Sequence, residues 1–116
     1  MWLADKLSLS NLIFVEDSKI DSLDFNGCVC FEVFEHIRDP FVTVSRLLSN
    51  TCNYLFESSS FTVPSPGHLQ TFIHDGVLLT GRQTGFHFPK YIRKLGFQTT
   101  AVFWNNRPRV WERITV

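Results

Sequence analysis

Residues 30–40 decide the fold of this chain, with the sequence Cys30-Phe31-Glu32-Val33-Phe34-Glu35-His36-Ile37-Arg38-Asp39-Pro40. The stretch ends in a strong helix start, because an Asp at the N-cap accepts from free amides of the first turn and Pro at the first helical position removes no needed donor. Just before it, residues 28–31 are a continuous apolar run. Such a run is typical of a buried strand covered on both faces. The stretch therefore predicts a strand followed by a helix.

The neighbouring segments extend this pattern into an α/β fold. Apolar residues recur at helical spacing after the Asp-Pro pair, namely Phe41, Val44, Leu47 and Leu48, and the pattern ends at residues 49–51. Residues 54–56 are again apolar and predict a second strand, which a helical crossover would place parallel to the first. Upstream, the apolar residues 12–15 predict one more buried strand.

The second half of the chain predicts a mixed sheet. In residues 58–87, serines, prolines and glycines interrupt short apolar pieces, so we expect a long connection with one helical turn around residues 69–77. Pro89 is expected to open a further helix that Gly96 ends. Residues 98–104 and 109–116 are strand-like, and the four residues between them are too few for a crossover. They therefore predict an antiparallel C-terminal hairpin.

Composition restricts the class of protein. The chain has 116 residues, 44% of them hydrophobic and 12 of them Phe, which indicates one packed domain and excludes a disordered tail. Its 11 basic and 11 acidic residues balance, so no overall field attracts nucleic acid or an anionic membrane. No signal-peptide pattern or long apolar span is present, and we expect a cytoplasmic protein without a membrane partner. The cysteines, Cys28, Cys30 and Cys52, are expected to be reduced core thiols.

Residues 30–40 resemble the segment after the fourth strand of class I S-adenosylmethionine-dependent methyltransferases, where a Glu-His pair and an Asp-Pro helix start recur. The predicted order of elements is also similar to the second half of that fold, including its reversed last strand. The resemblance implies a partial Rossmann-like methyltransferase fold with residues 12–15 as its third strand and residues 28–31 as its fourth. Residues 1–116 would then be a single incomplete methyltransferase-like domain.

The cofactor half of that family's site is missing from the sequence. The family binds S-adenosylmethionine with a Gly-x-Gly loop and an acidic residue for the ribose, and the six glycines of this chain never form such a loop. We expect S-adenosylmethionine binding to be weak or absent in the isolated chain. By the resemblance, Asp17 would lie near the adenine, and Phe31, Glu32 and Val33 along the methionine end.

A Glu-x-x-Glu-His array predicts a metal site. A helical turn would place Glu32, Glu35 and His36 on one face, and such ligands suit a divalent ion such as Mg²⁺ or Mn²⁺. The array is similar to metal sites of ubiquinone-biosynthesis O-methyltransferases and of small-RNA 3′-end 2′-O-methyltransferases. In the RNA enzymes a histidine just before the next helix completes the site, which His87 matches. The ion would bind hydroxyls of the methyl acceptor and lower the pKa of one.

The residues alone also allow simpler interpretations. The two glutamates can be a solvated strand end beside Arg38, and the loop residues His68 and His74 are assigned no role. Aromatic and basic residues near the C-terminus could form a nucleic-acid surface, but on an alternating strand such charges usually form the solvated face. These residues are Trp104, Arg107, Arg109, Trp111 and Arg113.

Three functions therefore stand as hypotheses. The first is O-methyl transfer to a small-molecule acceptor, with activity only when another chain supplies the missing half. The second is a non-catalytic interaction module whose exposed sheet edge self-associates or binds a partner. The third is a fragment of an RNA 2′-O-methyltransferase, although we do not expect nucleic acid as the partner.

Overall fold

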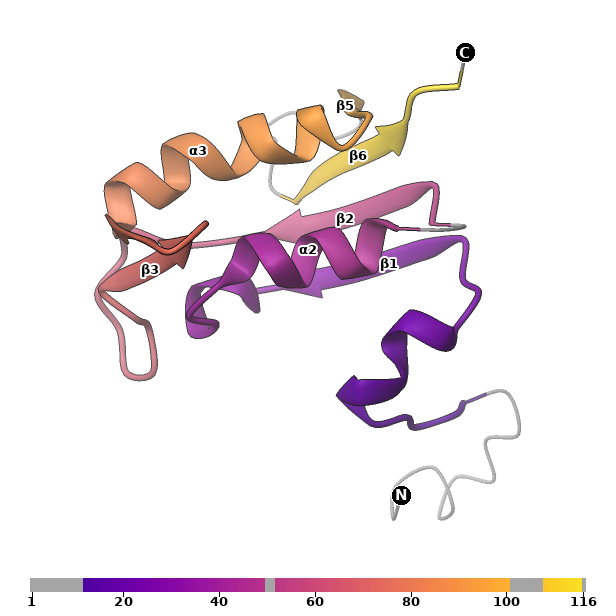
Figure 1. The fold of residues 1–116 in the computed structure, drawn as a ribbon, viewed down its shortest axis with the longest axis horizontal. Coiled ribbons are helices and arrows are strands. Elements are labelled where there is room, and N and C mark those ends of the chain that lie inside the picture. Colours follow the sequence, from indigo (N-terminus) through magenta and orange to yellow (C-terminus); the bar gives the residue numbers. More distant parts are fainter. Residues whose placement is uncertain (1–11, 50–51, 101–107, 116) are drawn as a thin grey trace.

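The computed structural model describes residues 12–49, 52–100 and 108–115, which form a small mixed α/β domain (Figure 1). A four-stranded sheet has the order β1 (Gly27–Phe31), β2 (Tyr54–Ser58), β6 (Arg109–Arg113) and β5 (Phe97–Thr100). A separate hairpin consists of β3 (Thr71–His74) and β4 (Val77–Thr80). The helices are α2 (Pro40–Leu48) and α3 (Gly81–Lys94), with short 3₁₀ turns η1 (Asp17–Ser22) and η2 (Phe34–His36).

The pairing of the strands agrees with the mixed sheet that the sequence predicts. Strand β1 pairs with β2 in parallel, and β2 pairs with β6 in the antiparallel sense. Strand β6 also pairs with β5 antiparallel, which confirms the C-terminal pair of strands. Of the predicted turn at residues 105–108 only Pro108 is described, and residues 101–104 of the predicted strand 98–104 also lie outside the described residues.

Helix α2 begins where the Asp-Pro pair predicts. The Asp39 carboxylate accepts a hydrogen bond from the Val42 amide at 3.0 Å, and Pro40 occupies the first helical position. The buried face of the helix carries Phe41 and Val44, which join the hydrophobic core. The helix therefore crosses back over the sheet from the carboxyl end of β1 to the amino end of β2, as a parallel β-α-β unit requires.

One face of the sheet is packed, and the other is open near β1. Leu55 of β2 lies beside both Cys28 and Trp111, and the core joins this face to both helices. On the opposite face Val29 is 63% exposed and Phe31 is 50% exposed. The expectation that β1 is covered on both faces is therefore wrong, because α2 and α3 pack on the same side of the sheet.

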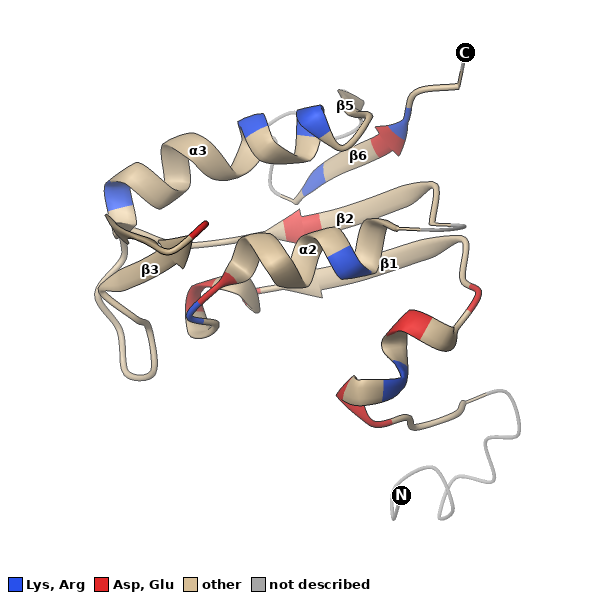
Figure 2. Cartoon of the chain, viewed as in Figure 1, with Lys and Arg blue, Asp and Glu red and all other residues tan. Residues whose placement is uncertain are grey.

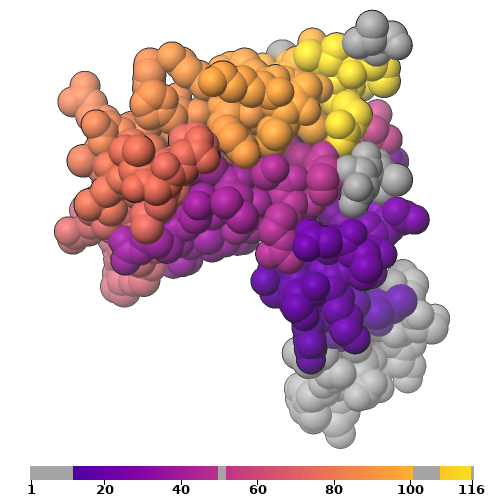
Figure 3. All heavy atoms as spheres, viewed as in Figure 1, coloured from indigo at the N-terminus to yellow at the C-terminus, as the bar shows by residue number. Residues whose placement is uncertain are grey.

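Residues 12–15 do not form the predicted strand. They have no regular secondary structure and pair with no described strand, and Ile13 is 80% exposed. The segment they begin runs through η1 and projects from the body of the domain (Figure 3). Among the described strands, β1 pairs only with β2, so the other edge of β1 is open, and residues 12–15 do not pair with it.

The connection after β2 is more regular than the sequence predicts. Instead of a helical turn, residues 71–80 form the β3–β4 hairpin, whose turn residues Asp75 and Gly76 both have positive φ values, 50° and 75°. Helix α3 starts at Gly81 rather than Pro89, because Thr80 and Gln83 form a reciprocal capping box. The end of the helix agrees with the prediction, since Gly96 follows it at φ 96°.

Acidic and basic residues both occur on several of the helices and strands (Figure 2). The acidic residues of η1 face the last turn of α2, where Arg46 lies 3.4 Å from Asp17 and 3.1 Å from Asp21. The charged residues of helix α3 are all basic. Among the residues described, neither helix combines the length and apolar composition needed to cross a lipid bilayer.

Candidate metal centre

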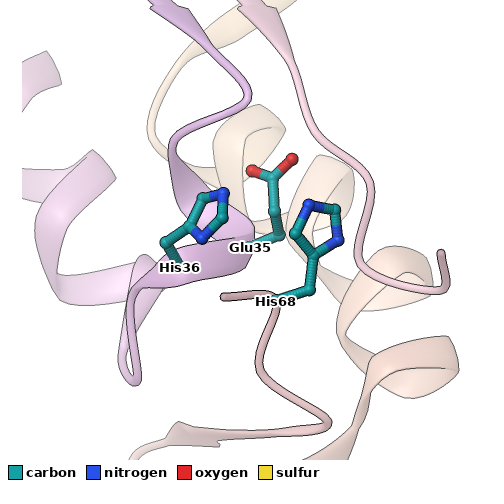
Figure 4. Close-up of side chains that lie close together, drawn as sticks. All are labelled: Glu35, His36 and His68. Atoms are coloured by element: carbon teal, nitrogen blue, oxygen red, sulfur yellow. The ribbon is translucent and has the colours of Figure 1, made fainter. Parts of the chain in front are cut away.

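Three side chains from two segments converge beside the carboxyl end of β1. Glu35 and His36 belong to η2, and His68 belongs to the connection before β3. One ligand atom from each of the three lies within 4.8 Å of the other two. Figure 4 shows that both imidazole rings turn a nitrogen towards the Glu35 carboxylate. Three groups this close together could hold a metal ion.

The histidines are held in the tautomer that a metal requires. His36 Nδ1 lies 2.7 Å from the Gly67 carbonyl oxygen, and His68 Nδ1 lies 2.7 Å from the Val63 carbonyl oxygen. A carbonyl oxygen only accepts, so each Nδ1 carries a hydrogen, and in the neutral form of each ring the lone pair is on Nε2. Metal-binding histidines are commonly oriented by such a hydrogen bond from the other ring nitrogen.

The carboxylate between the rings is buried and only partly satisfied. Glu35 has no exposed surface, and its Oε1 accepts one hydrogen bond from the Ser60 amide at 3.2 Å. Its Oε2 has no hydrogen-bond partner. Burial, followed by the neighbouring Glu32 carboxyl group, raises the pKa of Glu35. An unpaired buried carboxylate oxygen is costly, and a cation would offset that cost.

Backbone hydrogen bonds fix the loop that carries His68 against η2. The Leu69 amide donates to the Glu35 carbonyl oxygen at 3.0 Å, and the Ile73 amide donates to the Arg38 carbonyl oxygen at 2.8 Å. The Arg38 guanidinium also donates to the Thr71 carbonyl oxygen at 2.8 Å. These bonds bring together two segments that are far apart in sequence, and they determine which histidine meets Glu35.

Two of the four predicted ligands are not part of the three-residue cluster. Glu32 lies close by, but its carboxylate accepts hydrogen bonds from the hydroxyls of Ser58 at 3.1 Å and Ser60 at 3.0 Å. His87 is exposed in the middle of α3, with its ring beside Phe86. The prediction placed His87 just ahead of a helix, whereas α3 already begins at residue 81. His68, which sequence analysis left without a role, takes the place expected for His87.

The residues predicted to contact S-adenosylmethionine are divided between the two ends of the sheet. Phe31, Glu32 and Val33 lie at the carboxyl end of β1, the end at which open α/β sheets bind ligands. Asp17 lies in η1, where it pairs with Arg46 in the last turn of α2. That turn is at the amino end of the sheet, so the structure does not support the predicted position of Asp17 beside an adenine.

A cavity adjoins the three-residue cluster. Its volume is about 570 Å³, and it is lined by residues 61–65, 68–70 and 81–82. His68 belongs both to the wall of the cavity and to the cluster. A small molecule in the cavity would therefore reach the edge of the candidate metal site.

Comparison with protein-family models, with curated proteins and with solved structures gave no match. The resemblance of residues 30–40 to methyltransferases therefore stays a prediction. What the structure adds is the geometry of Glu35, His36 and His68, together with the strand order of the main sheet.

Proposed function

We propose that Glu35, His36 and His68 bind a divalent metal ion. The observation that carries the proposal is their convergence around a buried carboxylate oxygen that lacks any hydrogen-bond partner. Two imidazoles and one carboxylate favour Mn²⁺, Fe²⁺, Co²⁺ or Zn²⁺ over Mg²⁺, because magnesium strongly prefers oxygen ligands. The three protein ligands leave coordination positions for water or for a molecule in the adjoining cavity.

We further propose that this metal site serves methyl transfer to an oxygen of a small molecule. The resemblance implies a reversed last strand, and β6, the last strand of the described chain, does run antiparallel to β2. A bound divalent ion supplies Lewis-acid polarisation of an acceptor hydroxyl. The residues of this chain would hold the acceptor in the cavity, and His68, which lines the cavity, joins it to Glu35 and His36 of the cluster.

An interaction module is the second candidate, and the open face of the sheet favours it. Val29, Phe31 and Tyr54 are exposed apolar residues on the same face, opposite the helices. Contiguous apolar surface of this kind commonly marks a protein interface. The two candidates are compatible, since the metal cluster and the open face do not share residues.

Thermal unfolding with and without metal tests the metal site. We expect Mn²⁺, Co²⁺ or Zn²⁺ to raise the melting temperature, because a ligand that binds only the folded state stabilises it by about 2.7 kcal/mol at one hundred times its Kd. His68→Ala should remove this effect, and His87→Ala should keep it. A wild-type protein that no divalent ion stabilises would contradict the proposal, as would loss of the effect in His87→Ala.

Calorimetric titration with S-adenosylmethionine tests the cofactor expectation. The chain lacks a Gly-x-Gly loop, and Asp17 lies away from Phe31, so we expect weak or undetectable binding. A Kd of about 1 μM or tighter, equivalent to about 8 kcal/mol, would show that this expectation is wrong.

A further inference from the structure

Strand β1 carries two thiols in direct contact. Side chains two residues apart in a strand point to the same face, and the sulfur atoms of Cys28 and Cys30 lie 3.5 Å apart. Cys30 is buried in the core, whereas Cys28 is half-buried and reaches the surface. The two cysteines are therefore a pair with one accessible and one protected member.

We propose that Cys28 and Cys30 form a redox-active dithiol that exchanges with small-molecule disulfides such as oxidised glutathione. In the first step the Cys28 thiolate attacks one glutathione sulfur, the glutathione disulfide bond breaks, and one glutathione leaves as a thiolate that takes up a proton. In the second step Cys30 loses its proton to solvent and attacks the Cys28 sulfur, which expels the other glutathione. Two protein thiols are oxidised, and one glutathione disulfide is reduced to two thiols.

The surroundings assign the order of the two steps. A hydrogen bond from the Cys30 thiol lowers the pKa of Cys28, and the same contact together with burial raises the pKa of Cys30. Glu57, the neighbour of Cys30 on β2, adds negative charge that disfavours a Cys30 thiolate. Burial also raises the pKa of Cys52, whose thiol donates to the Tyr54 carbonyl oxygen. Of the three thiols, Cys28 is the one that is accessible and has a lowered pKa.

The geometry makes this disulfide a reversible one. Residues two apart in an extended strand have Cα atoms about 6.6 Å apart. Disulfides span about 4.4 to 6.8 Å between Cα atoms, so the bridge forms only at the upper limit of that range or with local shortening of β1. A bond under such strain is readily reduced again by a thiol. The pair is thus suited to exchange rather than to permanent cross-linking.

Mass spectrometry after treatment of the folded chain with oxidised glutathione, followed by alkylation, tests the proposal. We expect the wild-type peptide that contains residues 28–30 to lose two hydrogens without retaining glutathione. Cys30→Ser should stall with one glutathione on Cys28, and Cys52→Ser, the matched control, should behave as the wild type. Stable glutathione on Cys28 in the wild type, or a disulfide that requires Cys52, would overturn the proposal.

The rate of alkylation of the wild-type chain as a function of pH provides a test that needs no variant. Because its pKa is lowered, Cys28 should react with iodoacetamide at a lower pH than Cys52. Equal pH profiles for the two thiols, or slower reaction of Cys28, would overturn the proposed role of Cys28 as the attacking thiol.

Discussion

At the scale of single residues, Glu35 combines full burial with an unpaired oxygen. The pKa of Glu35 is raised in the folded state. The protonated carboxyl group therefore contributes stability to the fold, and this contribution is fully present below the ordinary glutamate pKa of about 4.3. That contribution is lost as the pH rises through the raised value, and above that value the ionised group destabilises the metal-free chain. The cost of an unpaired buried group is about 1 to 3 kcal/mol.

We predict that Glu35→Gln stabilises the metal-free protein at a pH above the raised pKa of Glu35, and that it abolishes stabilisation by metal. The neutral amide removes the buried charge, but it is a poor ligand for a divalent ion. Thermal unfolding between pH 4 and pH 8, with and without Mn²⁺, measures both effects. If the variant is less stable than the wild type without metal, or if Mn²⁺ still stabilises it, Glu35 does not have the role proposed for it.

Gly67 is predicted to support the His36 ring. Its φ is +84°, and a Cβ at this position would lie 3.3 Å from His36 Nδ1. Gly67→Ala should therefore cost about 1 kcal/mol of backbone strain and also weaken metal binding, because the ring must move. Gly76→Ala is the matched control, since Gly76 has φ +75° with no atom within 4 Å. Metal titration of both variants should show weaker binding only for Gly67→Ala. Equal affinities would show that Gly67 does not hold the His36 ring in its metal-binding position.

Part of the site was predictable at this scale. Glu35 and His36 are neighbours in sequence, so a single turn is enough to place them together. The contribution of His68 depends on hydrogen bonds such as the one from the Leu69 amide to the Glu35 carbonyl oxygen, and residue types at the two positions do not reveal such a bond. His87 matched the expected position only while the start of α3 was placed at Pro89.

At the scale of elements, the junction between α3 and the loop before it depends on a glycine. A Cβ on Gly81 would overlap the Phe61 carbonyl oxygen. The Phe61 side chain packs against Phe72 and Phe88, so the loop has little freedom to retreat. This close approach places the first turn of α3 against the wall of the cavity.

We therefore predict opposite effects for two Gly→Ala substitutions in α3. Gly81→Ala should destabilise the protein by about 1 to 3 kcal/mol, as overpacking does. Gly85→Ala should stabilise it by about 0.5 to 1 kcal/mol, because a Cβ there meets the Phe61 ring at an ordinary 3.9 Å and Ala is the better helix former. Chemical denaturation of both variants measures the difference. A Gly81→Ala protein as stable as Gly85→Ala would contradict the packing described here.

The elements around β1 and α2 were predictable because local chemistry determines them. Asp39 and Pro40 specify a helix start, and the apolar runs on either side have the length of strands. Between residues 69 and 80 the apolar spacing is helical by coincidence, whereas the Asp75-Gly76 pair favours a type I′ hairpin turn. The Thr80 to Gln83 capping box likewise favours a helix start eight residues before Pro89. In both places the specific turn or cap outweighed hydrophobic periodicity.

At the scale of the whole molecule, the sheet has a packed side and an open side. Sequence periodicity predicted that β1 is apolar, but it could not show that both helices pack on the same face. Strand β1, at the edge of the described sheet, therefore exposes 63% of Val29 and 50% of Phe31. Among the described strands β1 pairs only with β2, so its other backbone edge is open. Exposed edges and apolar surface of this kind promote association of chains.

We predict that the isolated chain self-associates through this surface. Sedimentation velocity should show a dimer or larger species at high micromolar concentration. Val29→Lys combined with Phe31→Lys should shift the chain to monomer, because burying two ammonium groups in an apolar contact costs several kcal/mol. Val42→Lys is the control, since Val42 is 55% exposed but lies on α2, and it should leave the association unchanged. A wild type that stays monomeric, or a Val42→Lys variant that dissociates as readily as the double variant, would exclude the open face of β1 as the contact.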